Sequence, residues 1–341
     1  MIGLVVGAYG ITQLLLRIPQ GVLSDRWRKR KIFVIGAMFV SAVSALGMFW
    51  FQDVFALLLF RGLSGVAATV WVIMVVLFAS YFSSSDAPKA YGIMNSVNFT
   101  AQVVGMFAGG VVAEVWGWRS TFMLAAAGAT LGLGLSMFVR ENVPKVGPPL
   151  QLSQVPEILR NHHMLLASGL AIIVQLLTYG TVYGFVPVAA RHLGATNFEL
   201  GLLTTLASLP GIFASMLAGT WFVTRLGRRA TLCFGFFLMA LSAAIVPVLS
   251  STLQLFGTQL IGGFGRGLVF PLLMAFAVTS VGDRIKATAM GAFQSLYAIG
   301  MFVGPVLVGV VGDMAGLNAG FWLCGLVGLA GVGIAARYAG E

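Results

Sequence analysis

The sequence predicts an all-α polytopic membrane protein made of two related halves. Of its 341 residues, 59% are hydrophobic and only 9% are charged, whereas soluble domains carry about 25% charged residues. Its apolar runs reach the roughly 20 residues that a helix needs to cross a bilayer. A shift of 199 residues, which places Gly105 on Gly304, also superposes other glycines and loop charges of the two halves.

Eleven apolar runs are expected to form the membrane helices, five in the first half and six in the second. Glycine is abundant, with 44 residues, which suits helices that pack closely in a membrane. No stretch between the runs has the composition of a soluble domain. In chain order the runs cover about residues 1–20, 32–51, 54–80, 90–113, 119–139, 164–190, 199–223, 230–250, 253–281, 288–312 and 317–338.

The internal repeat suggests a division into two bundles. The shift of 199 residues also pairs Gly110 with Gly309 and Glu114 with Asp313. Repeated halves of a polytopic membrane protein, with a site between them, suggest a transporter. A polar, proline-rich stretch separates the halves and forms a natural boundary. The expected parts are an N-terminal bundle at 1–140, a cytoplasmic connector at 141–161 and a C-terminal bundle at 162–341.

One run of the second half has no partner in the repeat. The run at 199–223 maps onto the first run of this chain, whereas the run at 164–190 maps in front of Met1. We therefore expect helices 2 to 12 of a twelve-helix plan, with the first helix of the first bundle missing. A native eleven-helix protein is the alternative.

The basic residues orient the chain in a membrane. When the loops are assigned alternately to two sides, one side holds 15 of the 20 lysines and arginines, and the other holds Arg119 and Arg191. Because basic loops stay in the cytoplasm, we expect an integral protein of the plasma or bacterial inner membrane. Membrane orientation then explains the net charge of +10 without a nucleic-acid partner. The expected partners are the lipid bilayer and a small-molecule substrate, and we expect a monomer.

Polar side chains inside the apolar runs are candidates for a substrate cavity, because hydrocarbon penalises them. Asn95, Asn98 and Gln102 follow an i, i+3, i+7 spacing and share one helical face. The repeat pairs them with Gln294, Tyr297 and Met301, so two symmetric helices carry matching stripes. Interhelical hydrogen bonding is the structural alternative. The further candidates are Gln13, which shares a face with Tyr9 and Arg17, and Arg61, Gln175, Tyr179 and Arg266.

Arg266 is the strongest single candidate, because a charge at mid-membrane is costly unless it is paired or hydrated, and it would suit an anionic substrate group. All ten acidic residues lie at run ends or in loops. A proton-coupled transporter commonly needs a titratable group inside the membrane, so that group is another residue type, lies outside this chain, or is not needed. The sequence has no phosphate-binding loop and no metal constellation. We expect no enzyme and no cofactor beyond a proton or other ion gradient.

A basic loop motif occurs twice at equivalent places. The first copy is Gly21-x-x-x-Asp25-Arg26-x-x-Lys29-Arg30, and the second contains Arg225, Gly227, Arg228 and Arg229. With this motif, the repeat and the topology, the chain resembles the major facilitator superfamily over its whole length. It departs from the family pattern at Arg28, where glycine is usual, and at Thr224, where an acid is usual. The resemblance implies two bundles that rock about a central cavity, with the residues of both loop copies as a gate.

The glycine patterns of two symmetric helices resemble the antiporter motif of that family. The candidates for close helix packing are Gly105, Gly109, Gly110, Gly300, Gly304 and Pro305, with Met106 where proline is expected. The resemblance implies a secondary active transporter that works by alternating access and exports drugs or metabolites in exchange for protons. Uptake or exchange of an organic anion is one alternative. A non-transporting sensor, scaffold or inert remnant is the alternative from another class.

Overall fold

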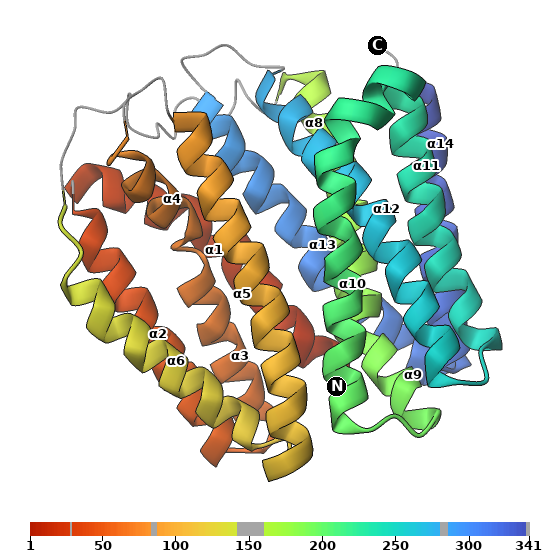
Figure 1. Ribbon diagram of the computed structural model, residues 1–341, viewed down its shortest axis with the longest axis horizontal. Helices are drawn as coiled ribbons and strands as arrows, with labels where there is room; N and C mark the ends of the chain where they lie inside the picture. Colours follow the sequence, from red (N-terminus) through yellow and green to blue (C-terminus); the bar gives the residue numbers. More distant parts are fainter. Residues whose placement is uncertain (28, 83–86, 142–159, 280–285, 339–341) are drawn as a thin grey trace.

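The computed structural model describes residues 1–27, 29–82, 87–141, 160–279 and 286–338, and this part of the chain is helical without strands (Figure 1). The first half contains α1 (Ile2–Trp27), α2 (Arg30–Trp50), α3 (Val54–Ala68), α4 (Trp71–Ala79), α5 (Ala87–Trp116) and α6 (Ser120–Met137). The second half contains α8 (His162–Leu177), α9 (Val186–His192), α10 (Asn197–Leu217), α11 (Val223–Ile245), α12 (Thr252–Thr279), α13 (Lys286–Ala315) and α14 (Leu317–Tyr338). The connector predicted at 141–161 lies almost wholly outside the described residues.

The helices are long and apolar enough to cross a membrane. Ten continuous helical stretches in the described residues meet this criterion, and one of them, Asn197–Val248, is 52 residues long. That stretch is kinked at Gly227, whose φ of 79° is readily reached only by glycine. On either side of the kink, α10 and α11 run in opposite directions and both pack against α12 (Figure 1). The stretch therefore supplies two crossings, and the described residues contain the eleven crossings expected from the hydropathy pattern.

Polar side chains define several helix starts, as helix capping requires. Asp53 accepts a hydrogen bond from the Ala56 backbone N–H at 2.9 Å and starts α3. Thr196 and Glu199 form a reciprocal capping box at the start of α10. These caps satisfy backbone groups at the helix starts that have no intrahelical partner.

Two expected crossings are irregular. The run at 54–80 divides into α3 and α4 at Thr69, whose hydroxyl donates to the Val66 carbonyl oxygen at 2.6 Å and also contacts Gln20. The run at 164–190 consists of α8, a π-helical segment at Thr178–Phe185 and α9. Such π segments often occur at functional sites. Both irregular crossings contribute side chains to the space between the halves.

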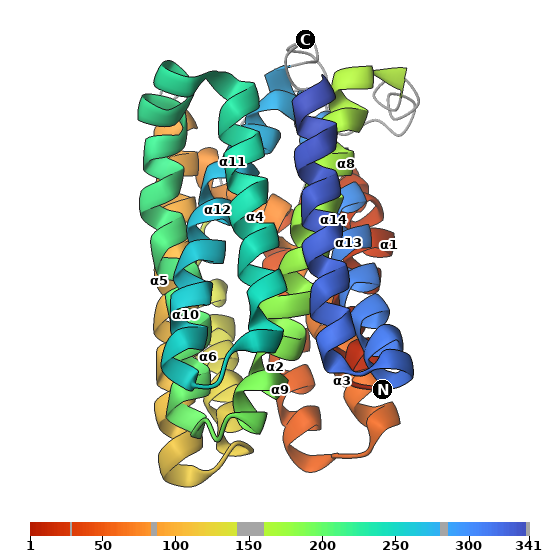
Figure 2. The same ribbon diagram turned by 90° about the vertical axis from the view of Figure 1, so that its right-hand side faces the viewer.

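The halves meet along two pairs of helices, α1 with α13 and α5 with α10. Figure 1 shows α5 and α10 converging toward the lower end of the molecule, and Figure 2 shows the same two helices next to each other along its left-hand side. A Cβ added to Gly110 of α5 would lie 2.8 Å from the Gly201 Cα of α10. Glycine at both positions therefore lets the two backbones touch.

The two halves are packed to different extents. Only 11% of the most apolar stretch of α5 is buried, against 44% for its repeat mate α13. In the second half α8 packs against α12, α13 and α14. The described part of the first half contains no helix that corresponds to α8. The larger core accordingly gathers around α8, whereas the first half holds a small cluster around Val34, Val70 and Leu77.

Because of this difference, the structure does not show the predicted close packing at two of the glycines, Gly105 and Gly109. A Cβ at Gly300 or Gly304 of α13 would collide with the backbone of α8 at Ile172 or Leu176. A Cβ at Gly105 would meet no described atom within 4 Å, and the same holds for Gly109. Close packing was expected at Gly105 and Gly109, but it requires a neighbouring helix. Among the described residues a helix lies against Gly300 and Gly304 of α13, and none lies against Gly105 and Gly109 of α5.

Candidate substrate cavity

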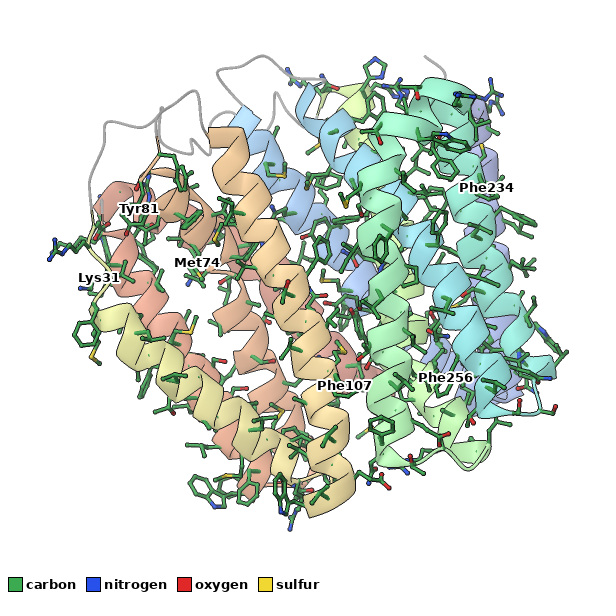
Figure 3. All side chains as sticks on the ribbon, viewed as in Figure 1. Lys31, Met74, Tyr81, Phe107, Phe234 and Phe256 are labelled. Atoms are coloured by element: carbon green, nitrogen blue, oxygen red, sulfur yellow. The ribbon has the colours of Figure 1, made fainter. Side chains whose placement is uncertain are left out.

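A cavity of about 540 Å³ lies between the halves. Its walls come from α1 to α5 on one side and from α8, the π segment, α10, α12 and α13 on the other. Met74 of α4, labelled in Figure 3, belongs to the wall of the first half. This volume lies within the roughly 300–1,000 Å³ that is usual for small-molecule sites.

Most of the polar side chains proposed from the sequence line this cavity. They are Gln13, Asn98, Gln102, Gln175, Tyr179, Arg266, Gln294 and Tyr297. The symmetric stripes of α5 and α13 therefore both face it, with Met301 completing the second stripe. The side chain of Asn95 lies outside the described residues.

Arg61 is a correction to the proposed lining. Its guanidinium carbon lies 5.0 Å from the centre of the Tyr9 ring, and Tyr9 rather than Arg61 lines the cavity. A cation over an aromatic face is stabilised by the ring quadrupole. The sequence places Arg61 about two turns into its helix but does not indicate this stacking, because the partner lies on another helix.

Arg17 is a cavity residue that was not among the proposed site residues, although the sequence grouped it with Tyr9 and Gln13. It is only 6% exposed. Its Nη1 donates to the Gln294 carbonyl oxygen at 3.2 Å and to the Tyr297 hydroxyl at 3.1 Å, and its Nη2 donates to Oε1 of Gln13. Arg17 thus connects α1 to α13 across the halves. The available sequence signal was a charge inside an apolar run.

Arg266 enters the cavity from the opposite half. Its Nη2 donates to the Ala207 carbonyl oxygen of α10 at 3.0 Å. The contact is possible because α12 lies directly on α10: a Cβ at Gly267 would be only 2.6 Å from the Gly211 Cα. The glycine-rich sequence around Arg266 therefore serves close packing and lets a carbonyl approach the cation.

Three tyrosine side chains of the cavity wall contact one another. The rings of Tyr9 and Tyr179 stack across the halves with centroids 6.0 Å apart, and Tyr179 meets Tyr183 edge to face at 5.2 Å. Among the described residues no carboxylate lines the cavity. No cluster of metal-binding side chains is found among them either. The cavity therefore combines aromatic surface, amides and positive charge.

The gating residues proposed from the sequence lie at one end of the molecule. Gly21 is buried in the last turns of α1, Arg26 is exposed, Lys29 is the residue before α2, and Arg225 and Arg229 are exposed near the kink of α11. Arg228 places its guanidinium 4.2 Å from the Phe276 ring centre within the second half. The side chain of Asp25 lies outside the described residues, so its role in a gate stays a prediction.

The basic loop after α1 is attached to the end of α6. Glu141 accepts hydrogen bonds from the backbone N–H groups of Arg30 and Lys31, and Nζ of Lys31 donates to the Met137 carbonyl oxygen at 2.7 Å. Lys31 and Tyr81 are both labelled in this region of Figure 3. Partial burial, with a smaller effect of Glu141, raises the pKa of Tyr81 above its usual value.

The opposite end carries contacts that join the halves. Nδ2 of Asn197 donates to the Ala113 carbonyl oxygen at 3.0 Å, and the Phe198 backbone N–H donates to Oε2 of Glu114 at 3.1 Å. Phe107 of α5, labelled in Figure 3, meets Phe198 edge to face at 5.8 Å. The carboxylate of Glu114 thus lies at the N-terminus of α10, where a negative charge is favoured.

A helical membrane protein with a central cavity between repeated halves has the architecture of a secondary transporter. The family model described as Major Facilitator Superfamily matches residues 1–179 and again residues 168–340. The chain therefore belongs to the major facilitator superfamily, and it is an integral membrane protein.

Its curated relatives are distant but cover most of the chain. An uncharacterized MFS-type transporter of Methanocaldococcus jannaschii is 23% identical over 93% of this chain and 83% of its own length. Multidrug resistance protein MdtG of Klebsiella pneumoniae is 24% identical, over 88% and 74%. Multi-drug resistance efflux pump PmrA of Streptococcus pneumoniae is 23% identical, over 95% and 82%. These similarities support a secondary transporter.

Proposed function

We propose that this protein exports small organic molecules across the plasma or bacterial inner membrane by alternating access, as a monomer and without catalysing a reaction. The observation that carries the proposal is the cavity between the halves, which gathers polar side chains from symmetric helices of both. Two of the similar proteins are described as multidrug resistance or efflux proteins, which supports export as the direction. Placing the basic loops in the cytoplasm follows the positive-inside rule.

In this proposal the halves open by separating α5 from α10 at the end opposite the basic loops. The Asn197–Ala113 and Phe198–Glu114 hydrogen bonds must then break. Each costs about 1 kcal/mol net, which is small enough for two conformations to interconvert. The glycine contact between Gly110 and Gly201 also separates.

We propose that protons drive export in exchange for substrate. No carboxylate lines the cavity among the described residues. In this proposal the group that exchanges the proton is therefore another residue type or lies outside the described residues.

Locking the two halves together tests the proposal. Cysteines replace Ala113 and Asn197 in a chain whose Cys233 and Cys324 are changed to alanine, and a short bis-methanethiosulfonate reagent links them. Proteoliposomes are loaded with ethidium, naphthalene-2-sulfonate or 2-naphthyl β-D-glucoside, and counterflow is measured. We expect exchange of at least one probe above protein-free liposomes, loss of exchange on linking, and recovery with dithiothreitol. Exchange that continues after complete linking would contradict rocking at this contact, and no exchange of any probe would contradict export.

A further inference from the structure

Arg17 is a buried cation with neutral partners. Its three hydrogen bonds go to a carboxamide, a backbone carbonyl and a phenol, from Gln13, Gln294 and Tyr297. Its Nε is buried and has no hydrogen-bond partner. A guanidinium has five N–H donors in a planar fork, so two of them are unused. Burying a charge without a counter-ion is costly, and an entering anion would relieve that cost.

A second cation faces the same cavity from the other half. Nη2 of Arg266 donates to the neutral Ala207 carbonyl oxygen. Arg61 adds a third positive charge directly behind Tyr9. Since no described carboxylate lines the cavity, the arginine charges are not neutralised there. The potential inside a low-dielectric cavity of this kind is positive and attracts anions.

The fold itself does not require these arginines. The shift of 199 residues pairs Arg17 with Met216, Arg61 with Leu260 and Arg266 with Ala67. Each of the three equivalent positions in the other half is thus occupied by an uncharged side chain. A cation inside a membrane helix is penalised by the bilayer, so a purely structural role is a poor explanation for three of them around one cavity.

The remaining walls suit an apolar body. Trp71 and Met74 line the cavity from the first half, and Phe270, Tyr179 and Tyr183 line it from the second. Aromatic walls bind flat apolar groups by stacking and by burial of apolar surface. The cavity thus offers aromatic surface beside two guanidinium groups that come from different halves.

We propose that the transported compounds are small organic anions with an aromatic or apolar body, and that Arg17 and Arg266 bind the anionic group. This inference rests on the proposed export function and specifies its substrate class. The bonds to Gln294 and Tyr297 use only Nη1 of Arg17, so an anion on the two unused donors supplies a counter-ion without displacing them.

Binding of three matched probes to the purified full chain in detergent tests the anion site. Naphthalene-2-sulfonate, 2-naphthyl-trimethylammonium and 2-naphthyl β-D-glucoside share the aromatic body and differ in charge. Calorimetry is expected to show the sulfonate binding at least tenfold more tightly than the other two. Arg17→Gln and Arg266→Gln should each weaken sulfonate binding tenfold or more and glucoside binding less than twofold. Arg119→Gln, at an exposed arginine outside the cavity, is the control and should change neither.

Arg17 also joins the halves, so a second variant separates charge from structure. Arg17→Lys keeps the positive charge and should retain a preference for the sulfonate over the glucoside of at least threefold. Equal losses for all three probes in the glutamine variants, or a wild type that prefers the ammonium probe, would overturn the proposal. Counterflow separates it from the export function: sulfonate binding without exchange supports the anion site and contradicts export. Equal exchange of all three probes supports export and overturns anion selectivity.

Discussion

Replacing Gly304 by alanine should destabilise the protein, whereas the same change at its repeat mate Gly105 should not. The added Cβ at Gly304 would lie 2.9 Å from Leu176 Cα and 3.0 Å from its carbonyl carbon. Carbon atoms pack best at about 3.5–4.0 Å, so α13 must move away from α8 by roughly 0.5–1 Å. At Gly105 the added Cβ meets no atom of the described residues within 4 Å.

The magnitude follows from lost dispersion contacts. A gap of about 0.5–1 Å forfeits a quarter to a half of each atom-pair well of ~0.1–0.2 kcal/mol. Over about 30 atom pairs around the contact, the loss is on the order of 2 kcal/mol, which agrees with the ~1–3 kcal/mol of typical overpacking. Membrane helices have no hydrophobic drive to compensate, because lipid is as apolar as their side chains. Glycine-to-alanine exchange favours both helices by up to about 1 kcal/mol, and this term cancels in the comparison.

The assay is unfolding of each variant in mixed micelles with increasing dodecyl sulfate, followed by tryptophan fluorescence. We expect the free energy of unfolding of Gly304→Ala to fall about 2 kcal/mol below that of Gly105→Ala. Gly105→Ala should equal or slightly exceed the wild type. Equal values for the two variants would refute the packing argument, because it depends on a helix packed against Gly304 that has no counterpart at Gly105 among the described residues.

Three further predictions concern the two ends of the molecule. Glu114→Gln removes the negative charge that accepts the hydrogen bond from the Phe198 N–H and weakens this hydrogen bond by about 1 kcal/mol. Maleimide should therefore label a cysteine at position 113 faster in this variant. Unchanged labelling would contradict a gate there. Glu141→Ala leaves the N–H groups at the start of α2 without their carboxylate and should cost about 1 kcal/mol of unfolding free energy, as loss of a helix cap does; no cost would mean that water replaces it. The pKa of Tyr81 is raised by burial, so its ionisation should destabilise the fold only as pH rises through that raised value, with no effect below pH 10. The absorbance at 295 nm of the wild type minus that of Tyr81→Phe reports this ionisation and should show a midpoint above 10. A midpoint at or below 10 would contradict the burial.

The sequence by itself determined the membrane class, the eleven crossings and the repeat. In a bilayer every backbone polar group must be satisfied within a helix, so hydropathy translates directly into crossings. Helical periodicity then identified the shared face of Asn98 and Gln102, because three to four residues make a turn in any packing. The family match over both halves agrees with this.

Only the tertiary structure decided what each face meets. Arg17 reaches Gln294 and Tyr297 because α1 lies along α13, and no spacing along one helix encodes a partner 280 residues away. Gly105 and Gly304 occupy the same place in the repeat, yet a Cβ at Gly105 would meet no described atom within 4 Å, whereas a Cβ at Gly304 would meet α8. A glycine only permits close approach, and whether a helix comes close depends on which neighbours the folded chain supplies.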